Sequence, residues 1–168
     1  MASRSEPVAD VLVRSSIKDE SPAIASVLKQ AFIGYEPLYT PAAFAATTPT
    51  SPQIQQRWHE GPVWVAVRKD KIVGTVSAVS KIPDLYVRSM AVLPNATGQG
   101  IGGQLLGEIE RFALDRHYKR LFLSTTPFLK EAIRLYQRFG FRRSGDGPHD
   151  LFGTPLFTMI KPLSPTAE

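Results

Sequence analysis

Apolar residues recur along this chain with two different spacings, and each spacing predicts one kind of secondary structure, strand or helix. Short runs rich in Val, Ile, Leu and Phe, bounded by charged or turn-forming residues, predict β-strands. These runs cover residues 11–14, 63–68, 71–80, 85–93, 121–125, 141–143 and 155–160. Three consecutive runs from 63 to 93 have no helix between them, and a tight turn at Lys69-Asp70 joins the first two. This order predicts an antiparallel meander.

Apolar residues at helical spacing predict helices around these strands. One helix spans 21–32, with Ser21 as its N-cap and Pro22 in its first turn. The segment 37–52 predicts loop and short helix, and 54–60 a further helical piece. After the glycine-rich segment, one helix is predicted by an apolar stripe that consists of Ile101, Leu105, Leu106, Ile109, Phe112 and Ala113. A second helix, which Gly140 ends, is predicted by a stripe that consists of Ala132, Leu135, Tyr136 and Phe139.

The length of 168 residues fits one domain. We therefore expect a single α/β domain with a mixed sheet over residues 11–163, preceded by a flexible tail at 1–10 and followed by a tail at 164–168. The first ten residues lack the apolar core of a signal peptide, and the apolar run 63–67 is too short to span a bilayer. These features predict a soluble, cytoplasmic protein.

Composition excludes several kinds of chemistry. The chain has no cysteine, which rules out a thiol nucleophile and any Cys-bearing zinc or iron-sulfur site, and we expect no metal site. The net charge is +5, but the basic residues are scattered, with Lys119-Arg120 and Arg142-Arg143 as the densest groups. We therefore expect no nucleic-acid partner, and a small polyanionic ligand is the partner that this charge favours.

The segment VLPNATGQGIGGQLL (92–106) contains the pattern G-x-G-x-x-G at Gly98, Gly100 and Gly103, between a predicted strand and a predicted helix. Backbone N–H groups at a helix start bind phosphate, and glycines let the phosphate approach. A dinucleotide-binding domain would carry an acidic residue about 20 residues further on. Here the next strand ends in Ser124-Thr125-Thr126 instead. A nicotinamide enzyme is therefore disfavoured, and the loop alone leaves a plain structural turn open.

Two segments together resemble the GNAT superfamily of acyl-CoA-dependent N-acyltransferases. The first, YVRSMAV with the glycine segment after it, fits the family pattern V-x-P-x-x-[RQ]-G-x-G-[IV]-G-x-x-L-L from Val92. The second, KEAIRLYQRFGFRRSG (130–145), fits N-x-x-A-x-x-[LF]-Y-x-x-x-G-F. The resemblance implies a GNAT-like fold: a mixed, mostly antiparallel sheet that is flanked by helices and splayed between its two central strands. It also implies that the glycine loop holds the pyrophosphate of acetyl-CoA or coenzyme A.

The resemblance implies roles for individual residues. The Tyr136 hydroxyl would protonate the departing CoA sulfur, and a backbone N–H near Met90 would stabilise the oxyanion. The implied cofactor-binding residues are Met90, Ala91, Val92, Thr97, Gly98, Gln99, Gly100, Ile101, Gly102, Gly103, Ser124, Thr125, Thr126, Leu129, Ala132 and Tyr136. For the acceptor we expect Phe32, Tyr35, Tyr39, Arg88 and His149, although packing alone explains the three aromatic residues equally well.

Three positions depart from the family pattern. Thr97 stands where Arg or Gln is usual, and Leu129 stands where Asn is usual. Arg88 stands where many relatives carry the glutamate that accepts the substrate proton, and it either binds an acidic acceptor or faces outward. The sequence therefore does not identify the general base. The candidates are His149, Asp150, Glu60 and His59, with His149-Asp150 as first choice. An exposed turn is the alternative interpretation of the His149-Asp150 segment.

The implied reaction is acetyl transfer from acetyl-CoA to the primary amine of a small-molecule or peptide acceptor by direct attack. The alternative is a non-catalytic CoA-binding sensor, against which the presence of Tyr136 argues. Arg134 and Arg138 are candidates for the 3′-phosphate of coenzyme A, with a solvated helix face as the preferred interpretation. We expect no membrane partner and leave a homodimer open.

Overall fold

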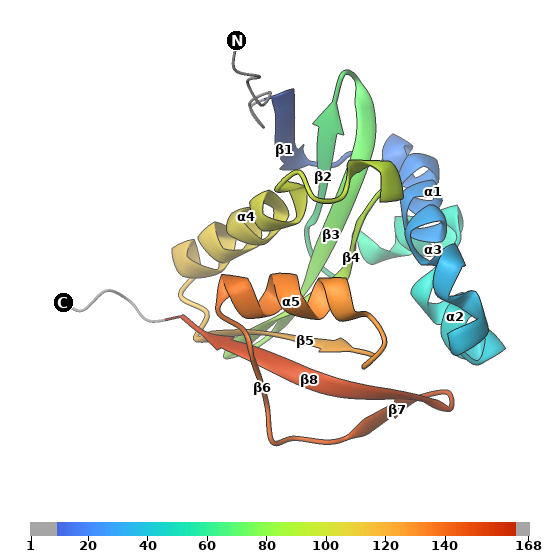
Figure 1. Cartoon of the computed structure of the whole chain (residues 1–168). Coiled ribbons are helices and arrows are strands. Elements are labelled where there is room, and N and C mark those ends of the chain that lie inside the picture. The colour runs from blue at the N-terminus through green and yellow to red at the C-terminus, as the bar shows by residue number, and fades with distance from the viewer. Residues whose placement is uncertain (1–9, 164–168) are drawn as a thin grey trace, which may run out of the picture.

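The computed structural model describes residues 10–163, so residues 1–9 of the predicted tail at 1–10, and the predicted tail at 164–168, lie outside the described residues. Within these residues eight strands form one sheet of order β1-β2-β3-β4-β5-β8-β6, and β7 pairs with β8 (Figure 1). The strands are β1 (Val11–Ser15), β2 (Val63–Arg68), β3 (Lys71–Lys81), β4 (Asp84–Val92), β5 (Arg120–Thr125), β6 (Arg142–Arg143), β7 (His149–Leu151) and β8 (Thr154–Pro162).

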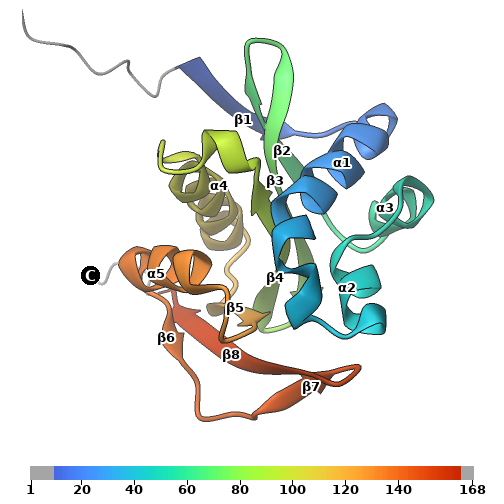
Figure 2. The same ribbon diagram turned by 45° about the vertical axis from the view of Figure 1, so that its right-hand side comes forward.

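Helices lie on both faces of this sheet. They are α1 (Ser21–Phe32), α2 (Pro41–Thr47), α3 (Ser51–Arg57), α4 (Ile101–Asp115) and α5 (Lys130–Phe139). α1 packs on β3 and β4 from one side, with α3 against it, and α4 packs on the same strands from the other side (Figures 1 and 2). α5 lies beside α4, above β5 and β8. The sheet core is therefore covered on both faces, as the apolar pattern predicts.

The strand pairing confirms the predicted meander and the predicted splay. β1 to β4 pair antiparallel in sequence order from the edge, and Lys69 and Asp70 turn the chain between β2 and β3 with φ of 51° and 63°. β4 and β5 pair in parallel only over Asp84–Tyr86 and Arg120–Phe122. Beyond these three residue pairs the two strands separate. The structure is therefore a mixed, mostly antiparallel sheet that opens between its two central strands.

The apolar stripe of α4 anchors the helix on the sheet. Ile101, Leu105, Leu106, Ile109 and Ala113 are all buried, and full burial of one Leu or Ile side chain stabilises the fold by about 1.5–3 kcal/mol. The backbone of β3 approaches this helix closely at Gly74, where an added Cβ would lie 3.2 Å from Leu105 Cδ1. The packing fixes the first turn of α4, and with it the glycine loop that precedes the helix.

The helix predicted over 21–32 is confirmed, but its predicted N-cap is wrong, and so is the predicted start of the helix over 54–60; local hydrogen bonds explain both differences. Ser21 is not the N-cap of α1: it lies in the first turn, and its Oγ donates to the carbonyl of Lys18 at 2.8 Å instead of accepting from the helix. The helix predicted over 54–60 begins earlier, at Ser51, because Thr50 and Gln53 form a capping box. It also ends earlier, at Arg57, before the predicted end.

The C-terminal region contains one strand that the sequence pattern did not predict. β7 (His149–Leu151) pairs with β8 in a hairpin whose turn is Phe152-Gly153, and Asp150 Oδ2 accepts the N–H of Gly153 at 2.8 Å. The strand predicted over 155–160 is longer in the structure, where β8 spans Thr154–Pro162. The strand predicted over 141–143 is shorter, because β6 spans only Arg142–Arg143. Among residues 10–163 no helix is long and apolar enough to cross a membrane.

The loop before β2 gives a test of this packing. An added Cβ at Gly61 would lie 2.0 Å from the carbonyl oxygen of Ala78 in β3, whereas one at Gly34 would meet nothing within 4 Å. Gly61→Ala should therefore destabilise the fold by about 2 kcal/mol or more, which lowers Tm by about 4–8 °C in a chain of this length. Calorimetric melting of both variants checks this, and equal Tm values for Gly61→Ala and Gly34→Ala would contradict it.

Candidate functional site

The separation of β4 from β5 leaves the second half of β4 with one open edge. Leu93 donates its N–H to the carbonyl of Val73 on β3 at 2.8 Å. Because successive N–H groups of an extended strand point to opposite edges, the N–H group of Val92 points away from β3, toward the opening. This edge therefore presents backbone donors and acceptors to whatever lies between the strands.

A β-bulge interrupts β4 beside this edge. Arg88 pairs with Ser77 and Ala91 pairs with Thr75, so the pairing shifts around Ser89 and Met90. Ser89 has φ of 56°, in the left-handed region that a non-glycine residue seldom adopts. The bulge changes the direction of β4 at the level where the two central strands have parted, and it therefore widens the opening.

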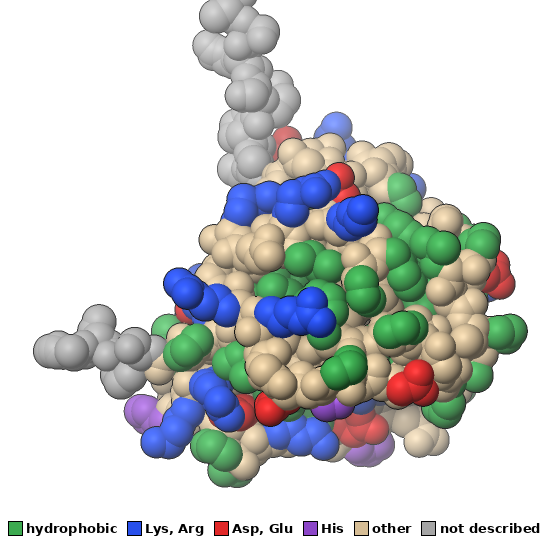
Figure 3. Space-filling model, turned by 60° about the horizontal axis from the view of Figure 1, so that its bottom comes forward, with side chains coloured by type: hydrophobic (Ala, Val, Ile, Leu, Met, Phe, Trp, Pro, Cys, Tyr) green, Lys and Arg blue, Asp and Glu red, His purple; other side chains and the backbone are tan. Residues whose placement is uncertain are grey.

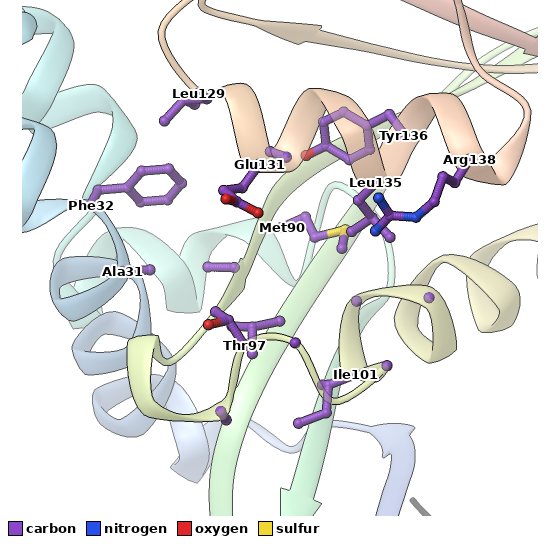
Figure 4. Close-up of a pocket in the computed structure, with 18 of the residues that line it drawn as sticks. Ala31, Phe32, Met90, Thr97, Ile101, Leu129, Glu131, Leu135, Tyr136 and Arg138 are labelled. Atoms are coloured by element: carbon purple, nitrogen blue, oxygen red, sulfur yellow. The ribbon is translucent and has the colours of Figure 1, made fainter.

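A first cavity of 360 Å³ lies between the glycine loop, β4 and α5 (Figure 4). Most of the predicted cofactor-binding residues line it: Met90, Ala91, Val92, Thr97, Gly98, Gly100, Ile101, Gly102, Gly103, Leu129, Ala132 and Tyr136. Gln99 does not, because its side chain turns to accept a hydrogen bond from Arg68 Nη1. The cavity is also lined by residues that were not among the predicted cofactor-binding residues, among them Ala31, Glu131 and Leu135.

The glycine loop presents free backbone N–H groups to the first cavity. Gly98 and Gly100 have φ of 78° and 83°, and α4 begins immediately after them. The first amide of the helix with a carbonyl four residues back is that of Gln104, which donates to Gly100 at 3.1 Å. The N–H groups of the residues between them have no such partner in the helix, and the positive end of the helix dipole lies there. The arrangement suits a bound anion.

Two arginines lie near the first cavity. Arg68, at the end of β2, donates a hydrogen bond to Gln99 and so places a positive charge beside the glycine loop. Arg138 extends toward the cavity from the last turn of α5 (Figure 4). Arg134 points elsewhere and pairs with Glu131 at 3.0 Å. In the space-filling view, hydrophobic side chains gather at the centre of one face, with most of the visible Lys and Arg to the left of them (Figure 3).

A second cavity of 270 Å³ lies on the far side of β4 and reaches β5, α2 and α3. The predicted residues Ser124, Thr125 and Thr126 line this cavity and not the first. Four side chains line both cavities: Phe32, Met90, Leu129 and Tyr136. The two cavities therefore adjoin where the central strands part, with Tyr136 at their junction.

Tyr136 is held with its hydroxyl toward this junction (Figure 4). Its ring is 8% exposed and packs edge-on against Phe141, with the ring centroids 5.8 Å apart. Burial, with a smaller contribution from Tyr39, raises the pKa of Tyr136 to about 12. The phenol is therefore protonated throughout the ordinary range of pH and can donate a proton or a hydrogen bond.

Two arginines line the second cavity. Arg88 Nη2 pairs with Glu60 Oε1 at 2.5 Å, and Arg57 Nη1 donates to Ser89 Oγ at 2.5 Å. Burial and the neighbouring Arg88 lower the pKa of Arg57 to about 10, which leaves it cationic at neutral pH. The sequence offered no signal for Arg57, because α3 precedes β4 by some length of chain and only the fold brings them together.

The remaining predicted residues are divided between the cavities and the surface. Phe32 and Tyr35 line the first cavity, and Tyr39 lines the second. His149 lines neither cavity and is exposed on β7, and Asp150 belongs to the hairpin turn. Among the other candidate bases, His59 is exposed and Glu60 is engaged by Arg88. The residues that line the second cavity include no carboxylate and no imidazole.

Comparison with known proteins identifies a family. Residues 31–141 match the model of the acetyltransferase (GNAT) family. The chain is 37% identical over 115 residues to the N-acetylaspartate synthetase of Xenopus tropicalis, which covers 66% of this chain and 42% of that protein. It is 30% identical over 143 residues to the uncharacterized N-acetyltransferase YjgM of Escherichia coli, which covers 80% of this chain and 83% of that protein. The chain thus spans less than half of the synthetase but most of YjgM.

Solved structures show the same fold. The PaiA N-acetyltransferase from Thermoplasma acidophilum in complex with coenzyme A superposes with a TM-score of 0.75 at 15% identity, over 90% of this chain and 98% of that one. A GNAT family acetyltransferase from Elizabethkingia anophelis with acetyl-CoA bound gives a TM-score of 0.67 at 21% identity, over 92% and 99%. These neighbours confirm the fold expected from the sequence.

Two adjacent glycines test the glycine loop as the anion site. An added Cβ at Gly103 would meet nothing within 4 Å and would enter the first cavity, whereas at Gly102 it would lie 2.6 Å from Leu135 Cδ2. Gly103→Val should therefore keep its Tm and raise the Kd for coenzyme A about tenfold or more, because the side chain obstructs the free amides. Gly102→Val should lose stability. We avoid Gly100 because its φ of 83° would add strain to any substitution.

Isothermal titration calorimetry with coenzyme A and thermal melting measure the two effects. If Gly103→Val bound coenzyme A as tightly as the wild type, the glycine loop would be a structural turn only.

Proposed function

The chain belongs to the acetyltransferase (GNAT) family, and on that premise we propose that it acetylates the primary amine of a small acceptor, which attacks acetyl-CoA directly, with Tyr136 as general acid. It is an N-acetyltransferase, and its acetyl donor is acetyl-CoA. The observation that carries the proposal is the junction of the two cavities at Met90 and Tyr136, where one cavity fits the donor and the other the acceptor. The predicted cytoplasmic location stays a prediction.

The first cavity fits coenzyme A by the chemistry of its lining. The free amides at the start of α4 suit the pyrophosphate, and Arg68 and Arg138 place positive charge beside it. The open edge of β4 at Met90 and Val92 offers hydrogen bonds to the amide groups of an extended pantetheine arm, as an edge strand does to an added strand. Acetyl-CoA supplies an activated carbonyl group with a thiolate leaving group.

The residues at the junction then act on that carbonyl group and that sulfur. A backbone N–H of the bulge near Met90 stabilises negative charge on the carbonyl oxygen, since a fixed donor costs no reorganisation when the charge develops. The Tyr136 hydroxyl holds the proton that the departing sulfur takes. The attacking amine must be neutral, and because no carboxylate or imidazole lines the second cavity, its proton passes to water.

The alternative function is a CoA-binding sensor without turnover. The position of Tyr136 at the junction of both cavities favours the enzyme, because binding alone requires no proton donor there. Thiol release from acetyl-CoA, measured across a panel of primary amines, separates the two functions. Release that depends on an amine supports the acetyltransferase, whereas tight binding of coenzyme A without release for any amine supports the sensor.

Removing the Tyr136 hydroxyl tests its role. Tyr136→Phe keeps the ring and its packing on Phe141 and should lower kcat about 10²-fold, at the lower end of the range for general acids because a thiolate leaves fairly readily. The KM for acetyl-CoA should change little, since the interaction forms mainly in the transition state. Steady-state kinetics on an acceptor from the amine panel measure both constants, and an unchanged kcat would make Tyr136 a packing residue.

The pH profile tests the protonation state of the same residue. A general acid works in its protonated form, so activity falls when pH rises through its pKa. Burial moves the pKa of Tyr136 upward to about 12, which places this fall above the usual assay range. We expect kcat/KM to rise with pH toward the pKa of the acceptor amine and not to fall between pH 7 and pH 9. A falling limb in that range, with the fold intact by circular dichroism, would contradict the assignment.

A further inference from the structure

The second cavity carries positive charge that the described part of the chain does not balance. Arg57 and Arg88 both line it, and its lining includes no Asp or Glu. Glu60 pairs with Arg88, but within residues 10–163 Arg57 has no ion-pair partner. Burial raises the pKa of the adjacent Tyr86, so that phenol stays neutral and does not supply the missing negative charge.

This arrangement is unfavourable for the charged form of Arg57. Its guanidinium is partly buried, and its hydrogen bond goes to the neutral hydroxyl of Ser89 at 2.5 Å. Withdrawal from water and the proximity of Arg88 disfavour its charge, Glu60 offsets only part of this, and the pKa of Arg57 is lowered to about 10. A partly buried cation without an ion-pair partner is costly, and groups perturbed in this way are typical of functional sites.

A further donor in the same cavity lacks a partner. Arg88 Nε is buried and makes no hydrogen bond. A buried donor without an acceptor destabilises the fold. One bound group with several acceptor oxygens would satisfy this donor and neutralise Arg57 together, and a carboxylate matches the planar fork of a guanidinium.

We propose that the second cavity selects acceptors of amino-acid size that carry a carboxylate, and that Arg57 and Arg88 bind this carboxylate while the amine faces Tyr136 and Met90. The inference rests on the proposed acetyltransferase function and names its substrate class. The volume of 270 Å³ is at the small end of ligand pockets, which favours a small molecule over a folded protein surface. The arginines are specificity residues, since the reacting atoms lie at the junction with the first cavity.

Matched acceptors test the charge requirement. Amino acids are assayed beside their own carboxamides, which keep the amine and the side chain and lack the carboxylate charge. For the acids that are acetylated, the wild-type kcat/KM should exceed that of the amides about 10- to 100-fold. Arg57→Gln and Arg88→Gln should each remove most of this preference by raising KM for the acid. Arg57→Lys keeps the positive charge but lacks the planar guanidinium. Its preference for the acid should therefore lie between that of the wild type and that of the two Gln variants.

The control is Arg111→Gln, which removes an exposed arginine that pairs with Glu108 on α4, away from both cavities. It should leave the preference unchanged. If amines are acetylated but acids and amides react equally, or if Arg57→Gln slows both alike, the inference is wrong and the acetyltransferase function stands. If no amine releases thiol, the proposed function itself fails.

A binding measurement tests the carboxylate site without turnover. In the presence of coenzyme A, the amino acids should raise the Tm of the wild type, whereas their carboxamides should not. Arg57→Gln should lose this stabilisation. Without added amino acid, the Tm of Arg57→Gln should be close to that of the control Arg111→Gln. Equal stabilisation by acids and amides, or none by any acid of the panel, would overturn the proposal.

Discussion

The chemistry of this protein depends on a single interruption of backbone pairing. β4 and β5 share three residue pairs and then separate, and each paired residue beyond that point would have closed the opening in which both cavities lie. An unpaired strand edge in the middle of a sheet is ordinarily costly, because its N–H and C=O groups lose their partners. In the proposed function, the same groups at Met90 and Val92 bind the pantetheine arm of the donor.

The surrounding packing keeps the opening from closing. α4 is fixed on the sheet by its buried stripe and by the close approach at Gly74, and this places its free amides at one end of the opening. α5 sits against α4 through Leu135 and Gly102 and holds Tyr136 at the junction. The first cavity, our proposed donor site, is thus supported by α4 and α5, whereas the second cavity, our proposed acceptor site, is lined in part by shorter elements, α2, α3 and the β7-β8 hairpin.

This difference explains how much the sequence could predict. The donor side follows from local signals, since the glycine loop and the helix stripe through Leu105 and Leu106 are continuous in sequence. The acceptor side depends on residues that only the fold brings together: Arg57 meets Ser89 across more than thirty residues of chain, and no periodicity marks either of them. β7 was missed because it has only three residues, of which His149 and Asp150 are exposed and polar, and the capping box at Thr50 was overlooked among the prolines and threonines around it.

An experimental structure with bound coenzyme A would show whether the donor sulfur lies where the two cavities meet. We expect the pyrophosphate at the start of α4, the pantetheine arm along the open edge of β4, and the sulfur within about 4 Å of the Tyr136 hydroxyl, close enough for a hydrogen bond. A sulfur directed away from Tyr136, or coenzyme A bound outside the opening between β4 and β5, would contradict this expectation.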